Sequence, residues 1–165
     1  MPTLIVYSNS HGGTTAAVDL LAARLVGRVM SVDLKKNENP DPSNYEGVIV
    51  GGSVFAGQMP KRVRRYLEAR SSLLKTKKLG LFTASLEEGE KAEQEFKAAF
   101  PADLVAHAAA KGYFGADIDI DKMNFLEKMA AKKAGLTDSV SKLKAEAIIA
   151  FAAVMSEGIE SNDGL

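Results

Sequence analysis

The sequence has 165 residues, a usual length for one domain with a sizeable core. Hydrophobic residues make up 46% and charged residues 25%, which is ordinary for a globular protein and argues against disorder. The formal charge is zero, so the overall charge does not point to nucleic acid as a partner. There are no cysteines, which excludes disulfides, iron–sulfur clusters and cysteine nucleophiles, so any redox chemistry needs a bound cofactor.

The first apolar run follows the N-terminus without a basic segment or a small-residue cleavage site. This run, 3–7, predicts a strand buried on both faces rather than a signal peptide. The apolar stretches are far shorter than the roughly 20 residues that span a bilayer. We therefore expect a cytoplasmic protein with no transmembrane segment.

Apolar runs and helical patterns alternate through the first two thirds of the chain. Such alternation predicts an α/β fold with a parallel sheet covered on both faces, and right-handed crossovers leave few strand orders. Strands are predicted at 3–7, 29–34, 47–52, 79–83 and 104–110, and helices at about 14–27, 60–74 and 90–100.

The last third departs from this alternation. An acidic loop is expected at 117–121, and it is followed by a helix over about 123–135. A final helix is predicted over about 138–155, and its first residue, an aspartate, suits an N-cap. Because no linker or repeat divides the chain, we expect one domain over 1–156 and a flexible tail over 157–165.

The segment between the first strand and the first helix carries the strongest functional signal. Free N–H groups and the positive end of a helix dipole favour an anion at such a place, glycines allow close approach, and hydroxyls add donors. The alternative is that these hydroxyls only cap the helix, and His11 is equally suited to a surface or capping role. The predicted phosphate-binding residues are Ser8, Asn9, Ser10, His11, Gly12, Gly13, Thr14 and Thr15.

Other sites of the same general architecture do not fit this sequence. The loop lacks the lysine of a Walker motif and the glycine spacing of a dinucleotide fold. A response-regulator receiver needs acidic residues after the first strand and an aspartate at the end of the third, where this chain has Ser8-Asn9 and Gly51-Gly52. A low-molecular-weight phosphatase needs a cysteine, and the chain has none.

The first loop resembles that of the flavodoxin family, whose phosphate loop follows roughly Ser/Thr-x-Thr-Gly-x-Thr. Gly12 and Thr14 match this pattern, whereas Asn9 and His11 depart from it. The resemblance implies a flavodoxin-like three-layer sandwich, with a five-stranded parallel sheet in the order 2-1-3-4-5 and helices on both faces. It also implies non-covalently bound flavin mononucleotide (FMN), which passes electrons to partner proteins or to a small-molecule or quinone acceptor.

The loops after the later strands would then surround the flavin ring. Phe55 could cover the ring, Gly57 could lie near the flavin N5, and Tyr113 is a further aromatic candidate. The alternatives are a core residue for Phe55, a turn glycine for Gly57 and a structural role for Tyr113. The predicted ring-binding residues are Ser53, Val54, Phe55, Ala56, Gly57, Thr83, Ala84, Ser85 and Tyr113.

A closer resemblance is to the flavodoxin-type, menaquinone-dependent protoporphyrinogen oxidases. It implies an extra helical segment after the fifth strand, here about 113–135. Three functions therefore stay open: an electron-transfer flavoprotein, an oxidase with a quinone acceptor, and a flavin-free binding module of the same fold. The residues that carry this closer resemblance are Ser8, Gly12, Thr14, Gly51, Ser53 and Gly57.

Overall fold

The computed structural model describes residues 2–9, 13–54, 57–118, 124–133 and 140–158. The strands are β1 (Thr3–Ser8), β2 (Val29–Asp33), β3 (Gly47–Ser53), β4 (Lys78–Ala84), β5 (Ala110–Tyr113), β6 (Asp117–Ile118) and β7 (Val140–Ser141). The helices are α1 (Gly13–Arg24), α2 (Lys61–Leu74), α3 (Gly89–Ala99), α4 (Ala102–His107), α5 (Phe125–Lys133) and α6 (Ala145–Ser156).

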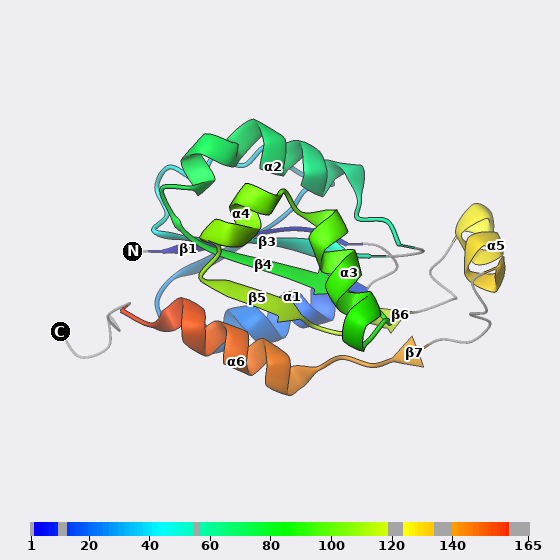
Figure 1. Cartoon of the computed structure of the whole chain (residues 1–165). Coiled ribbons are helices and arrows are strands. Elements are labelled where there is room, and N and C mark those ends of the chain that lie inside the picture. Colours follow the sequence, from blue (N-terminus) through cyan, green and yellow to red (C-terminus); the bar gives the residue numbers. More distant parts are fainter. Residues whose placement is uncertain (1, 10–12, 55–56, 119–123, 134–139, 159–165) are drawn as a thin grey trace.

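Strands β1 to β5 form one parallel sheet in the order β2-β1-β3-β4-β5, which confirms the predicted order. Helices α2, α3 and α4 cover one face of this sheet, and α1 and α6 cover the other (Figure 1). Strands β6 and β7 form a separate antiparallel pair. The fold is therefore the α/β three-layer sandwich that the sequence predicts.

The central strands contribute side chains to both layers, because successive residues of a strand point to opposite faces. Val6 and Val50 pack on the α2 side, whereas Ile5 and Ile49 pack on the α1 side. All seven residues of β3 are buried. A strand covered on both faces needs a continuous apolar run, which is the pattern that the sequence shows there.

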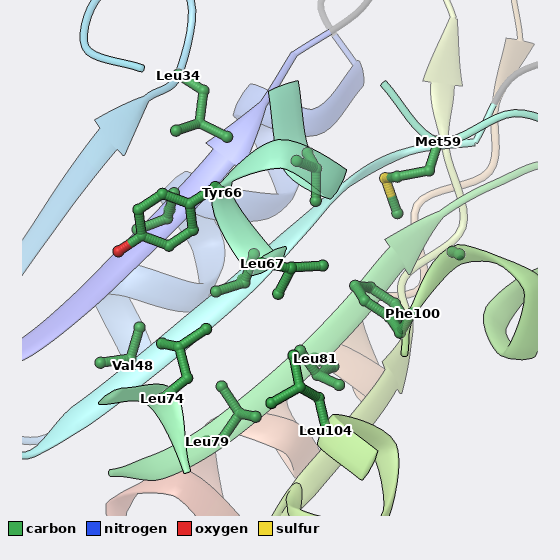
Figure 2. Close-up of a cluster of buried hydrophobic side chains, with 14 of the residues drawn as sticks. Leu34, Val48, Met59, Tyr66, Leu67, Leu74, Leu79, Leu81, Phe100 and Leu104 are labelled. Atoms are coloured by element: carbon green, nitrogen blue, oxygen red, sulfur yellow. The ribbon is translucent and has the colours of Figure 1, made fainter. Parts of the chain in front are cut away.

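The α2-side core forms because α2 has one apolar face. Pro60 precedes the helix with φ −54°, a value already suited to a helix start. Tyr66, Leu67 and Leu74 are buried and lie over the sheet (Figure 2). The Tyr66 hydroxyl donates a hydrogen bond to the Pro40 carbonyl oxygen at 2.9 Å, which satisfies the polar end of this buried ring.

Three aromatic rings fix α6 against the other face of the sheet. Phe82 of β4 and Phe114 stack with centroids 4.6 Å apart and planes at 16°. Phe151 of α6 meets both rings edge-on, with centroid distances of 6.5 and 5.1 Å. Gly80 makes room for this contact, because a Cβ there would lie 2.7 Å from Phe151 Cζ.

The fifth strand predicted at 104–110 is wrong. This run is mostly helix α4, and β5 begins only at Ala110. Pro101 stands at the N-cap of α4, and Leu104 is the fully buried side chain of this helix. A short apolar run fits one face of a helix as well as a strand, so periodicity alone did not separate the two.

The segment that follows β5 also differs from the prediction. The expected acidic loop begins with β6, and the final helix begins at Ala145 instead of 138, because Val140 and Ser141 pair with β6 as β7. The helix expected over 123–135 is present as α5. Outside the described residues lie the proposed N-cap Asp138 and nearly all of the expected tail.

The two ends of this excursion, which comprises β6, α5 and β7, are joined by backbone hydrogen bonds. The Lys142 N–H donates to the Ala116 carbonyl at 2.8 Å, and the Lys144 N–H donates to the Phe114 carbonyl at 2.9 Å. The excursion thus leaves the sheet after β5 and returns to nearly the same place before α6. In Figure 1, α5 projects beyond the edge of the sheet where the strands end.

Candidate functional site

The carboxyl ends of four strands meet in one row at the same edge of the sheet. Ser8 pairs with Gly52, Gly52 pairs with Thr83, and Thr83 pairs with Tyr113. The loops predicted to bind a cofactor follow these positions. In open α/β sheets, ligands bind outside the carboxyl ends of the strands, so the register brings the predicted loops to the expected edge.

In the first loop, Ser8 is buried at the end of β1 and Gly13 begins α1. The Asn9 side-chain oxygen, Oδ1, accepts hydrogen bonds from the N–H groups of Thr14 at 3.0 Å and Thr15 at 3.3 Å. These are N–H groups of the first helical turn, which have no partner inside the helix. Three predicted residues lie outside the described residues: Ser10, His11 and Gly12.

Two buried hydroxyl groups near this edge have no hydrogen-bond partner among the described residues. Thr14 Oγ1 belongs to the first turn of α1 and is fully buried, and Ser53 Oγ stands at the end of β3 in a residue only 8% exposed. Leaving a hydroxyl buried and unpaired costs about 1–3 kcal/mol. Such atoms fit a site whose polar ligand completes their hydrogen bonds.

A third unpartnered hydroxyl shows that this feature is not confined to one edge. Thr3 Oγ1 is buried without a partner among the described residues, but Thr3 begins β1 and so lies at the amino end of the sheet. The position of Thr14 and Ser53 beside the predicted loops, and not the missing partner alone, is therefore what marks them.

The second loop starts inside the core and then reaches the surface. Val54 is buried in the α2-side cluster, and its N–H donates to the Ala84 carbonyl at 2.8 Å. Gly57 is exposed with φ +76°, and a Cβ there would meet nothing within 4 Å. A positive φ favours glycine, so the sequence choice follows from the backbone. Phe55 and Ala56 lie outside the described residues.

The third loop is held to α3. Thr83, Ala84 and Ser85 are buried. The Ser85 hydroxyl donates to Glu95 Oε1 at 2.6 Å and accepts from the Glu87 N–H at 3.1 Å. The Ser85 side chain thus fixes the loop, while the backbone of 83–85 borders the row of strand ends. Sequence reasoning missed Glu95, which no local motif marks as a partner of Ser85.

Tyr113 closes the row on the β5 side. Its ring is half-buried and packs edge-on against Phe96 with a centroid distance of 5.3 Å. Burial, with a smaller effect of the Glu93 charge, raises the pKa of the Tyr113 hydroxyl above its usual value. The phenol is therefore neutral at physiological pH, and its ring contributes to the α2-side core as well as to the edge.

Two surfaces of opposite charge flank this edge. The exposed charged residues at the start of α2 are basic, and those around the start of α3 are acidic except for Lys91, which pairs with Glu87. A pocket of about 230 Å³ lies between α2 and the loop after β2 and is lined in part by Arg62, Arg65 and Tyr66. The basic residues are Lys61, Arg62, Arg64 and Arg65, and the acidic ones are Glu87, Glu88, Glu90 and Glu93.

The residues that the structure describes include neither a metal-binding cluster nor a membrane-spanning helix. Among them, no cluster of three or more histidine, aspartate or glutamate side chains could hold a metal ion. No helix in that part of the chain is both long and apolar enough to cross a membrane.

Comparison with known proteins gives one family. A model of the flavodoxin domain matches residues 4–135. No curated protein sequence is significantly similar to this one.

Several solved flavodoxin structures have the same fold at low sequence identity. Oxidised flavodoxin 1 from Bacillus cereus is 14% identical, with a TM-score of 0.53, over 97% of this chain and 100% of its own. A flavodoxin from Streptococcus pneumoniae TIGR4 is 16% identical, with a TM-score of 0.60, over 94% and 97%. A WrbA-like flavodoxin from Agrobacterium tumefaciens is 14% identical, with a TM-score of 0.54, over 93% and 96%. These likenesses support the fold.

Proposed function

Because this chain belongs to the flavodoxin domain family, we propose that it binds FMN non-covalently and transfers electrons through it. The observation that carries the proposal is the pair of buried, unpartnered hydroxyl oxygens on Thr14 and Ser53, which lie beside the loops after β1 and β3. A phosphate ester at the start of α1 would accept hydrogen bonds from backbone N–H groups and from the Thr14 hydroxyl.

The chain's own residues would bind and orient the cofactor. The first loop has no lysine or arginine, so neutral hydroxyl and amide donors would hold the phosphate. Bound FMN would supply the redox chemistry, which the side chains cannot provide. The phosphate would be held by Ser8, Ser10, His11, Gly12, Gly13, Thr14 and Thr15, and the ring framed by Ser53, Val54, Phe55, Ala56, Gly57, Thr83, Ala84, Ser85 and Tyr113. Asn9 belongs to the same loop, and its side chain bonds the N–H groups of Thr14 and Thr15.

A second candidate is an oxidase of the protoporphyrinogen type with a quinone acceptor. The feature that favours it is the helical excursion between β5 and α6, which carries α5 beyond the edge of the sheet where the strands end. An anaerobic assay with protoporphyrinogen and a quinone separates the candidates. Turnover supports the oxidase, whereas FMN binding without turnover supports an electron carrier that serves partner proteins.

The test of FMN binding is a titration of the flavin-free protein with FMN and with riboflavin, followed by flavin fluorescence. Thr14→Val removes the unpartnered hydroxyl at nearly constant volume. Since a hydrogen bond to a charged group contributes about 1.5–3 kcal/mol, we expect the variant to bind FMN at least about 10-fold more weakly. Riboflavin lacks the phosphate, so its affinity stays unchanged.

Thr3→Val is the matched control, because Thr3 Oγ1 is also buried and unpartnered among the described residues but stands at the opposite end of the sheet. It should bind FMN with the affinity of the unaltered protein. If neither fluorescence nor melting temperature responds to FMN, the chain is a flavin-free module. Equal FMN affinities for Thr14→Val and Thr3→Val would show that the phosphate does not bind at the start of α1.

A further inference from the structure

Asn9 occupies the donors that a phosphate would need. Its Oδ1 atom accepts from the N–H groups of Thr14 and Thr15, five and six residues further along the chain. A usual N-cap residue bonds two or three residues ahead, so this contact is longer in sequence than an ordinary N-cap. A helix N-terminus offers the same N–H groups to phosphate oxygens.

The cap that Asn9 provides is incomplete. One carbonyl oxygen satisfies two backbone N–H groups, but the buried Thr14 Oγ1 beside them keeps no partner among the described residues. A phosphate ester has three terminal oxygens and can accept from the amides and from the hydroxyl together. The site is thus better matched to a phosphate than to the side chain that occupies it.

We propose that Asn9 is an internal competitor of the phosphate, an inference that rests on the proposed FMN function. When the site is empty, Oδ1 takes the place of one phosphate oxygen and stabilises the start of α1. When phosphate binds, Asn9 releases both N–H groups. Because the contact stabilises only the empty state, it raises the stability of the flavin-free protein and weakens flavin binding by the same free energy.

Asn9→Ala tests this by two readouts with opposite signs. Loss of a cap should lower the melting temperature of the flavin-free protein by about 2–5 °C. The same loss should tighten FMN binding by about 3- to 10-fold, since the phosphate no longer displaces a side chain. Riboflavin affinity and the melting temperature of the FMN-saturated protein should not change.

Asn9→Asp tests the same contact in the other direction. A carboxylate at a helix start is favourable, so the flavin-free protein should melt about 1–3 °C higher. The new charge repels the phosphate, and FMN should bind at least about 10-fold more weakly, again with riboflavin unaffected. The matched control is Asn124→Asp, because the Asn124 Oδ1 accepts from the Glu127 N–H at the start of α5. It should leave FMN affinity unchanged.

Each other result overturns the inference. If Asn9→Ala weakens FMN binding, Asn9 is a phosphate ligand, and if it lowers both melting temperatures equally, Asn9 is an ordinary cap. If the unaltered protein binds no FMN, the proposed function fails. The competition between Asn9 and a phosphate can then be tested with inorganic phosphate alone. Against chloride of equal ionic strength, phosphate should raise the melting temperature of Asn9→Ala more than that of the unaltered protein. Equal or absent shifts refute the competition.

Discussion

Tyr66 is a large, polar and almost completely buried side chain, only 1% exposed. Its hydroxyl group finds one partner, the Pro40 carbonyl oxygen, and this contact joins α2 to the loop after β2. Burial raises the pKa of Tyr66 to about 12, and the charge of Arg70 acts in the opposite direction. The neutral phenol is therefore part of the folded structure.

Tyr66 should make the stability of the protein depend on pH in the alkaline range. Because the folded pKa of about 12 exceeds the ordinary tyrosine value of 10.0, the stability that the neutral Tyr66 phenol contributes is complete below pH 10 and is lost as pH rises toward 12. We expect the free energy of unfolding in denaturant to fall with pH over this window. Tyr66→Phe should make the fall shallower, and should cost about 0.5–1.5 kcal/mol at neutral pH.

Tyr7 and Tyr113 also have raised pKa values, so part of the alkaline loss will persist in that variant. The informative quantity is the difference between the two pH profiles. Parallel profiles for Tyr66→Phe and the unaltered protein would mean that the Tyr66 phenol titrates alike in the folded and unfolded chains.

Sequence patterns predicted which residues gather at the carboxyl ends of the strands better than they predicted the hydrogen bonds of those residues. Hydroxyl and glycine residues after buried strands predicted a shared edge for these loops, and the register places Ser8, Ser53 and Thr83 at adjoining strand ends. The acceptor role of Asn9 could not be predicted, because its partners lie five and six residues ahead and not at the usual N-cap spacing. The bond of Ser85 to Glu95 depends on the packing of α3.

At the scale of elements, the sequence predicted the strands whose apolar pattern fits a buried strand and no other element. The runs that became β1, β3 and β4 are continuous, apolar and bounded by polar residues or glycines. The sequence of β5, Ala-Lys-Gly-Tyr, has weak strand character, and its place is set by pairing with β4. Two-residue strands such as β6 and β7 leave no periodicity to detect.

The excursion between β5 and α6 should be removable. Because hydrogen bonds join Ala116 to Lys142 and Phe114 to Lys144, a Gly-Gly link from Ala116 to Lys142 can replace residues 117–141. Shortening a loop changes closure entropy only slightly, so we expect a cooperative thermal transition within about 5 °C of the full chain. Far-ultraviolet circular dichroism, which reports helix content, measures this thermal transition.

A substitution at Gly115, where the excursion begins, gives a change in melting temperature to compare with that of the deletion. Its φ is +70°, and a Cβ would collide with the Lys142 carbonyl, so Gly115→Ala in the full chain should lower the melting temperature. If the deletion abolishes cooperative melting, the excursion is an essential part of the core, and the single-domain description must include it.

At the scale of the whole molecule, stability is concentrated in the middle layer. The two core clusters meet across β1, β3 and β4, and every residue of β3 is buried. In contrast, α5 exposes three large apolar side chains, Phe125, Leu126 and Met129. The opening of backbone hydrogen bonds should therefore differ strongly between these two parts.

Hydrogen–deuterium exchange measured by mass spectrometry should show this gradient. Amides of β3 should exchange only through global unfolding, and those of α5 should exchange at least about 100-fold faster through local opening. Peptides covering α6, which the Phe82–Phe151 contact holds to the sheet, should resemble β3. Equal protection of α5 and β3 would show that α5 is part of the same cooperative unit.

The opposite charges at the starts of α2 and α3 give the molecule an electric dipole across the edge of the sheet where the strands end, although its net charge is zero. With no monopole, long-range attraction of a charged partner is weak, and the field acts mainly as a torque that turns the approaching molecule. Screening confines this torque to about 8 Å at physiological ionic strength. A charged partner would thus be turned toward the productive orientation only in the last steps of its approach. Salt would therefore change the fraction of collisions that are productive more than it changes the frequency of collisions.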